Sequence, residues 1–329
     1  MINRALGIFH SYRHPLIDIG RRFLPVRPSL LSLRKQNTQN RRAMNSKSHY
    51  EAHTAESYEN AYFYEEGEYS HYLRNLVVDK LKLKEKDSFS GTRKLLDIGG
   101  GTGNFTAAIT KEACGRMTSI VVDPFLPETS LLDEQKTTAI QFVKASAEEF
   151  MIDPPHKDSS STLWRTSYHQ ILMKEVVHHF QPKDRVPIFE GMKKGFSATD
   201  SNNSNGGTMD KAPSLLIITR PQRDIDYPLW DAAREVWAQN QPHADELCQD
   251  LELAGFSRIA QTVEAYPCSI TLERWQAMVK SRFWSTFANF TDAELEHACK
   301  GMVSREKDRI GSDGQIRFED RLVFISAFL

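Results

Sequence analysis

A cluster of glycines follows Asp97 at the end of an apolar run, residues 95–98. The glycines occupy positions 99, 100, 101 and 103, and residues 105–111 resemble the start of a helix. Because glycine has no Cβ, a ligand can approach the backbone closely and positive φ angles are accessible. The first turn of a helix also offers backbone N–H groups that lack an internal partner. The sequence therefore predicts a strand, a ligand-binding turn and a helix in succession.

The spacing of these glycines separates two kinds of nucleotide site. The dinucleotide fingerprint G-x-G-x-x-G would use Gly99 and Gly101, but its third glycine position is Asn104. The residues present instead read D-x-G-x-G-x-G, from Asp97 to Gly103. A nicotinamide-dependent dehydrogenase therefore stays an alternative that the missing glycine weakens.

The D-x-G-x-G-x-G pattern resembles motif I of the class I S-adenosylmethionine-dependent methyltransferases. The resemblance implies that the cofactor is S-adenosyl-L-methionine. It also implies that the amino acid part of this cofactor is held by the residues of the motif, which are Asp97, Gly99, Gly101 and Gly103. An ordinary strand–turn–helix of another α/β protein is the alternative.

Two further acidic positions extend the predicted cofactor site. Asp123 follows a second predicted strand, 118–122, and can accept hydrogen bonds from both ribose hydroxyls. A turn or N-cap role before Pro124 is the alternative for this residue. After a third predicted strand, the resemblance implies that Ala147 and Glu148 lie beside the adenine, and a solvated helix start is the alternative there.

A pair of histidines, His178 and His179, follows the fourth predicted strand, 168–174. Ligands of open α/β sheets bind outside the carboxyl ends of the strands. The resemblance to the class I methyltransferases implies that the motif after the fourth strand faces the methyl group of the cofactor. We therefore expect Lys174 at the cofactor, and one histidine as a general base or an acceptor-orienting group, because His titrates near neutral pH. A structural pair that shapes the pocket floor is the alternative.

Arg220 follows a fifth predicted strand, 214–219. A guanidinium can hold a carboxylate through two parallel hydrogen bonds. Arg220 and the nearby Trp230 are therefore predicted to bind a small acceptor, with a carboxylic acid as one candidate. The alternative is a surface ion pair of Arg220 with Asp224 or Asp226.

Composition changes near residue 48. Residues 1–48 contain ten basic residues and a single acidic one, Asp18, with serines and apolar residues among the arginines. This composition is typical of an organellar transit peptide. We expect the mitochondrion, with a plastid or the cytoplasm as alternatives, and a disordered basic leader is the competing interpretation.

The remainder, residues 49–329, is predicted to be the methyltransferase domain. Residues 49–83 are rich in tyrosine and are expected to form an N-terminal helical lid, in which Tyr64 or its neighbour Tyr62 lines the acceptor pocket. Packing of the tyrosines against the sheet edge is the alternative.

The predicted elements give an α/β fold with a doubly wound, seven-stranded, mostly parallel sheet. Further elements are expected as helices at 227–237, 244–254, 271–284 and 291–302 and as strands at 256–263 and 321–328. The resemblance implies that the last strand inserts antiparallel beside the fifth. Residues 264–310 would then be a helical insertion whose aromatic residues roof the acceptor pocket or form a plain apolar core.

Several classes of function receive no support from the sequence. A net charge of −1 gives no reason to expect a nucleic-acid partner, and no apolar run approaches the roughly 18 residues that span a bilayer. The four cysteines lack C-x-x-C spacing, so no metal site is predicted. The fourth strand is not followed by an N-P-P-[YF] motif, which argues against methylation of nucleic-acid bases or glutamine. The oligomeric state is not indicated.

These patterns predict a methyltransferase that acts on an oxygen, sulfur or nitrogen atom of a small molecule. The alternative is a protein with the methyltransferase fold that serves as an organellar assembly factor or binding protein without turnover. The intact Asp97, glycine turn and Asp123 favour the enzyme, because a site without turnover is free to lose them.

Overall fold

Seven strands form one sheet in the order β3-β2-β1-β4-β5-β7-β6 in the computed structural model of the chain. The structure describes residues 68–85, 91–126, 139–152, 168–196 and 214–329. The basic leader, Tyr64 and most of the predicted lid lie outside these residues.

The first five strands are parallel to one another, and β7 is antiparallel to both β5 and β6. This arrangement confirms the predicted doubly wound sheet, including the antiparallel last strand beside the fifth. The strands are β1 (Arg93–Ile98), β2 (Met117–Val122), β3 (Ile140–Val143), β4 (Gln170–Lys174), β5 (Leu215–Thr219), β6 (Arg258–Thr271) and β7 (Gln315–Phe328).

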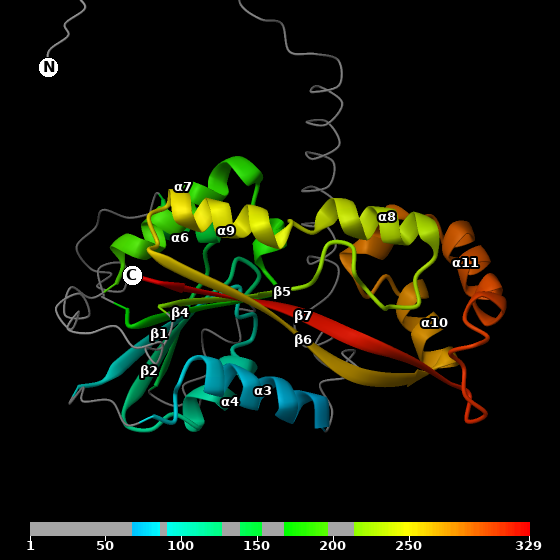
Figure 1. The fold of residues 1–329 in the computed structure, drawn as a ribbon, viewed down its shortest axis with the longest axis horizontal. Helices are drawn as coiled ribbons and strands as arrows, with labels where there is room; N and C mark the ends of the chain where they lie inside the picture. Colours follow the sequence, from blue (N-terminus) through cyan, green and yellow to red (C-terminus); the bar gives the residue numbers. More distant parts are fainter. Residues whose placement is uncertain (1–67, 86–90, 127–138, 153–167, 197–213) are drawn as a thin grey trace, which may run out of the picture. The chain divides into compact units, whose positions relative to one another are not determined.

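Helices cover both faces of the sheet (Figure 1), with α3 and α4 on one face and α6, α7 and α9 on the other. The described helices are α3 (Glu68–Lys80), α4 (Asn104–Lys111), α6 (Ala147–Met151), α7 (Pro182–Lys194), α8 (Asp231–Asn240), α9 (Ala244–Leu253), α10 (Leu272–Lys280) and α11 (Asp292–Arg305). Two short 3-10 turns, η2 (Val177–His179) and η4 (Ser285–Asn289), complete the set. None of the helices in the described ranges is long and apolar enough to cross a membrane.

The core is divided between the two faces because successive strand residues point to opposite sides. Leu216 and Ile218 of β5 pack in the cluster that includes α3, whereas Leu215 and Ile217 pack in the cluster under α7 and α9. A strand that is buried on both faces is an uninterrupted apolar run, as 215–218 is. This explains why the central strands were predictable from their composition.

Two predicted helices differ from the observed ones at their ends. The helix expected at 227–237 begins at Asp231, because Pro228 disfavours the helical conformation of the residue before it and Trp230 is an extended N-cap residue. The helix expected to reach residue 284 ends at Lys280, because Arg282 has a φ of +55°, a left-handed conformation that terminates a helix.

The last two strands are longer than predicted. The strand expected at 256–263 continues to Thr271, and the strand expected from 321 begins at Gln315. The start of the helical insertion, expected at 264, is therefore corrected to Leu272. Figure 1 shows β6 and β7 running together from the sheet towards α8, α10 and α11. Pro267 obscured this extension, since proline is tolerated on an edge strand but argues against a central one.

The close contact between α6 and α7 can be tested with two glycine-to-alanine variants. A Cβ on Gly191 of α7 would lie 2.5 Å from the backbone oxygen of Met151 at the end of α6. We expect Gly191→Ala to lower the free energy of unfolding by about 1–3 kcal/mol through overpacking. The matched control is Gly301→Ala in α11, where the Cβ would meet the flexible guanidinium of Arg305 and alanine favours the helix by about 1 kcal/mol. Urea unfolding measures both, and an equal loss in the two variants would contradict the proposed clash.

Candidate active site

The glycine turn joins β1 to α4 beside β4, where the order of the parallel strands reverses. Gly99 has a φ of +73°, and a Cβ there would lie 2.5 Å from Cγ2 of Val176, which follows β4. Gly101 has a φ of +54°, and a Cβ there would meet no described atom within 4 Å. Gly103 is the N-cap residue of α4. Gly99 therefore permits close packing within the protein, and Gly101 presents its backbone to the side from which a ligand can approach.

Asp97 lies in β1 beneath this turn and is 2% exposed. Its Oδ2 accepts a hydrogen bond from the Thr106 hydroxyl, and its buried Oδ1 has no hydrogen-bond partner among the described residues. Burial raises the pKa of Asp97 from its ordinary value of 3.8 to about 6, against the opposing effects of the Thr106 bond and the Lys174 charge. The carboxylate is thus ionised near pH 7, and one of its oxygens is left for a donor.

Asp123 stands at the end of β2 and faces the same turn. Its Oδ2 accepts a hydrogen bond of 3.0 Å from the N–H of Gly101, and its Oδ1 accepts one of 2.8 Å from the N–H of Phe125. Burial raises the pKa of this carboxyl. The structure therefore brings the predicted ribose-binding residue to the glycine turn, and it also gives Asp123 the turn-stabilising role that was the alternative.

Lys174 at the end of β4 also faces this region. Its Nζ lies 5.1 Å from the ring centroid of Phe105 in α4, and its positive charge lowers the pKa of Asp97. The predicted adenine residues lie farther along the sheet, after β3. Ala147 is the buried first residue of α6, and the half-buried Glu148 follows it.

The start of α6 is stabilised by a capping box. The Ser146 side chain accepts a hydrogen bond from the N–H of Glu149, and the Glu149 side chain accepts one from the N–H of Ser146. The segment is therefore a capped helix start, as the alternative interpretation held. A role of Ala147 and Glu148 at the adenine remains a prediction.

Glu175 was not predicted, although it directly follows Lys174. Its φ is +55°, which is uncommon for a residue other than glycine. Its Oε2 lies 2.5 Å from Nη1 of Arg220. A non-glycine residue held in this region costs of order 1–3 kcal/mol and is found mainly at functional sites, but nothing in the sequence around Glu175 indicates such a conformation.

Arg220 at the end of β5 is buried in a network of ion pairs and hydrogen bonds. Besides Glu175, its partners are the Tyr227 hydroxyl, 2.6 Å from Nε, and Oδ1 of Asp320, 3.3 Å from Nε. The hydroxyls of Tyr227 and of Tyr69 in α3 both donate to Asp320. Burial raises the pKa of Tyr227 well above its ordinary value. The Tyr227 phenol is therefore a neutral donor near pH 7.

The alternative that Arg220 pairs with a surface aspartate is wrong. Asp224 pairs with Arg321 at 2.6 Å, and Asp226 pairs with Arg309 at 3.1 Å. The actual partner, Asp320, had one signal in the sequence. It lies in phase with the apolar residues of β7, which are Ile316, Phe318 and Leu322, and a carboxylate at such an inward position requires a buried partner.

The two predicted catalytic residues, His178 and His179, form the turn η2 with their ring centroids 4.0 Å apart. Burial lowers the pKa of His178 from 6.5 to about 4, and the charge of Arg220 adds to this effect. His178 is therefore neutral near pH 7, and one of its ring nitrogens is an acceptor. The structure thus places a neutral imidazole within the field of Arg220.

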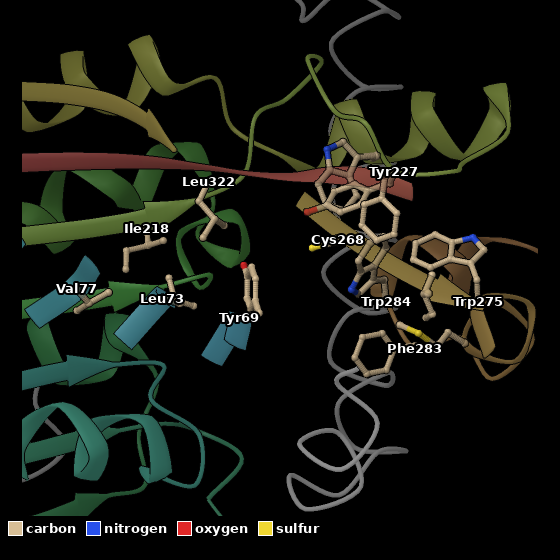
Figure 2. Close-up of a cluster of buried hydrophobic side chains, with 14 of the residues drawn as sticks. Tyr69, Leu73, Val77, Ile218, Tyr227, Cys268, Trp275, Phe283, Trp284 and Leu322 are labelled. Carbon is tan, nitrogen blue, oxygen red and sulfur yellow. The ribbon is translucent and has the colours of Figure 1, made fainter. Parts of the chain in front are cut away.

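Aromatic side chains that include Tyr227, Trp275, Phe283 and Trp284 gather in one buried cluster (Figure 2). Trp230 stacks on Phe287 at 6.0 Å between ring centroids and contacts the edge of Phe290 at 4.9 Å. Trp275 and Phe283 are almost fully buried, as expected for a plain apolar core. Trp284 is also buried, and the guanidinium carbon of Arg220 lies 6.0 Å from the centroid of its ring. The aromatic insertion therefore contacts the Arg220 network.

No known family model and no curated protein matches the sequence. Several solved structures are similar. A phosphoethanolamine N-methyltransferase 2 of Haemonchus contortus, in complex with phosphomonomethylethanolamine and S-adenosylhomocysteine, is 15% identical with a TM-score of 0.42. This match covers 78% of the present chain and 52% of the other, so the chain spans about half the length of that enzyme.

Two other solved structures show a similar identity and TM-score. A cyclopropane synthase of Mycobacterium tuberculosis is 16% identical, with a TM-score of 0.43 and coverage of 79% of this chain and 84% of the other. A SAM-dependent methyltransferase of Archaeoglobus fulgidus is 17% identical, with a TM-score of 0.40 and coverage of 77% and 94%. These similarities concern the fold. The strand order and the antiparallel β7 give the chain the fold of the class I methyltransferases.

The buried Asp97 predicts an unusual dependence of stability on pH. Folding raises the pKa of Asp97 from 3.8 to about 6. The protonated side chain therefore contributes its full stabilisation of the folded state below pH 3.8, and this stabilisation is lost as the pH rises through 6. The Asp97→Asn variant can still accept the Thr106 bond but avoids the buried charge. We expect the ligand-free variant to be more stable than the wild type by about 1–3 kcal/mol at about pH 8, and by about half of this at about pH 5.

Urea unfolding of both proteins at the two pH values measures this difference. The Asp313→Asn variant, which changes an exposed aspartate on the turn before β7, is the control for general effects of charge. A ligand-free Asp97→Asn variant that is less stable than the wild type at the higher pH would contradict the conclusion that burial of the charged Asp97 carboxylate destabilises the folded state.

Proposed function

We propose that the protein binds S-adenosyl-L-methionine and transfers its methyl group to a small molecule. One observation carries this proposal: Oδ1 of Asp97 is buried without a partner beneath a glycine turn that is open at Gly101. A buried carboxylate oxygen without a hydrogen bond is costly. The ammonium group of the cofactor's methionine part is a partner of suitable charge, whereas the pyrophosphate of a dinucleotide would be repelled.

The other residues of the turn suit the remaining parts of the same cofactor. Asp123 accepts hydrogen bonds from the protein through both oxygens, but each oxygen has a second lone pair for a ribose hydroxyl. When bound, S-adenosyl-L-methionine supplies a methyl group that is already activated on a sulfonium. The protein's main task is then to place donor and acceptor in line.

The acceptor side is the region at the ends of β4 and β5. His178 stays neutral and can accept a proton or a hydrogen bond there, which suits an acceptor whose attacking atom carries a proton. A thioether or tertiary amine needs no base, so an oxygen, sulfur or nitrogen acceptor is compatible with the site.

We propose a neutral acceptor in preference to the carboxylic acid that the sequence suggested. The single positive charge of Arg220 lies between the carboxylates of Glu175 and Asp320. Because both of these carboxylates already pair with the guanidinium, a carboxylate of the acceptor would have to compete with them for it in a buried place, which is unfavourable. A role as an assembly factor without turnover is the remaining alternative, and methyl transfer to an acceptor distinguishes the two.

The cofactor proposal is tested by calorimetric titration with S-adenosylhomocysteine. We expect the Asp123→Ala variant to bind it with about 1–3 kcal/mol less free energy, which is roughly 5- to 150-fold weaker, because a charged hydrogen-bond acceptor is lost. The control is Asp313→Ala, which should bind like the wild type. Unchanged affinity of a folded Asp123→Ala variant, or tight binding of NAD to the wild type, would count against the proposal.

The two histidines are tested with radiolabelled methyl transfer to fractionated metabolites from the source cell. For an acceptor that carries a proton on its attacking atom, we expect His178→Ala to lower turnover by about 10²–10⁴-fold and cofactor affinity much less. Because the pKa of His178 is about 4, the wild-type rate should not fall as the pH is lowered past the ordinary histidine value. A rate that halves near that value, or a larger loss in His179→Ala, would assign the role to the other histidine.

A further inference from the structure

Trp284 differs from the other tryptophans buried around it. The indole N–H of Trp237 donates to the carbonyl of Pro221 at 3.0 Å, and that of Trp275 donates to the carbonyl of Pro228 at 3.2 Å. Trp284 is 6% exposed, and its Nε1 is buried without a hydrogen-bond partner in the described part of the chain. Because the N–H of a buried tryptophan usually finds an acceptor, this exception requires an explanation.

The ring of Trp284 is held firmly by its neighbours. It contacts Tyr227 edge-on at 4.7 Å, Trp275 edge-on at 5.5 Å, and Phe287 by stacking at 5.8 Å between ring centroids. In Figure 2 its indole nitrogen points away from Trp275, towards the side on which Tyr69 lies. The N–H direction is therefore fixed by packing rather than by a hydrogen bond.

The ring of Trp284 lies close to residues at the carboxyl ends of β4 and β5. The guanidinium of Arg220 lies over the ring, and the same guanidinium pairs with Glu175 directly after β4. Thr219, the last residue of β5, has a buried hydroxyl that also lacks a partner among the described residues. Two unsatisfied polar groups thus accompany the Arg220 network at the carboxyl ends of the strands, where ligands of such sheets bind.

We propose that the indole N–H of Trp284 is a specificity-determining group that donates a hydrogen bond to a neutral oxygen of the methyl acceptor. The inference rests on the proposed methyltransferase function and specifies its acceptor. The oxygen belongs to a carbonyl or hydroxyl group attached to an apolar or aromatic body, because the surrounding side chains are aromatic. A carboxylate is disfavoured because Glu175 and Asp320 already pair with Arg220.

The first test compares the thermal unfolding midpoints of three ligand-free variants, Trp284→Phe, Trp275→Phe and Trp237→Phe. All three lose ring volume, but the two controls also leave a proline carbonyl without its donor, a buried one at Pro228 in Trp275→Phe and a half-buried one at Pro221 in Trp237→Phe. We expect Trp284→Phe to lower the midpoint by about 2–4 °C less than either control. An equal or greater loss in Trp284→Phe would overturn the proposal, because it would mean that the N–H is already satisfied inside the free protein, for example by a buried water.

The second test observes the indole N–H groups by NMR in protein labelled with ¹⁵N-tryptophan. The chain contains five tryptophans, and the Trp284→Phe variant identifies the signal of Trp284. With S-adenosylhomocysteine bound, we expect added benzamide, which carries a neutral carbonyl, to move the Trp284 proton downfield. Benzoate should move it less, and toluene, which has the ring without an acceptor, should not move it downfield. The signals of Trp237 and Trp275 should stay in place.

Two results would overturn the inference while leaving the cofactor proposal intact. One is binding of S-adenosylhomocysteine without any response of the Trp284 signal to benzamide, and the other is a larger response to benzoate. Failure of S-adenosylhomocysteine itself to bind, measured separately by calorimetry, would instead overturn the proposed function and with it this inference. The two kinds of failure are therefore distinguishable.

Discussion

Burial of the Arg220 guanidinium is the constraint on which the arrangement of β5, β7 and α3 depends. An unpaired charge in a protein interior costs several kcal/mol, so carboxylates must reach it with good geometry. Asp320 does so because β7 is inserted between β5 and β6, and its pairing with β5 begins at Val323, which leaves Asp320 just beyond the end of β5. The Tyr69 hydroxyl brings α3 to the same carboxylate. The antiparallel strand thus supplies the counter-charge that the end of β5 requires.

The same requirement extends to the glycine turn. Glu175 reaches Arg220 from a left-handed backbone conformation, and the next residue, Val176, packs so closely against Gly99 that no Cβ fits between them. The end of β4 is therefore fixed on one side by an ion pair and on the other by a glycine. This short segment therefore connects the Arg220 network directly to the glycine turn.

The features that the sequence predicted depend on neighbouring residues, whereas those it missed depend on residues far apart in the chain. The turn from Asp97 to Gly103 is a local pattern, and the central strands are apolar runs, so both were visible in the sequence. The Arg220–Asp320 pair joins residues 100 positions apart, and the signal that favoured Asp320 over the nearby Asp224 was its phase with the apolar residues of a strand that was predicted too short to include it. The length of β6 was hidden because it pairs with β7 over largely exposed positions, where no apolar alternation marks a strand. Tyr64 lies outside the described residues, so the lid remains a prediction.

Unsatisfied buried polar groups provide a physical link between the site and stability. Oδ1 of Asp97, Oγ1 of Thr219 and Nε1 of Trp284 are all buried without partners among the described residues. Asp97 and Thr219 lie near the carboxyl ends of β1 and β5, and Trp284 lies beside Arg220, which follows β5. Each such group costs about 1–3 kcal/mol, and together they amount to a large fraction of the roughly 5–15 kcal/mol by which a typical protein is stable. A ligand that satisfies them binds the folded chain and not the unfolded one, and so stabilises it by mass action. The cost of these groups is tolerated because the strands beneath them are mostly apolar and are paired on both sides, and the proposed ligand would relieve it.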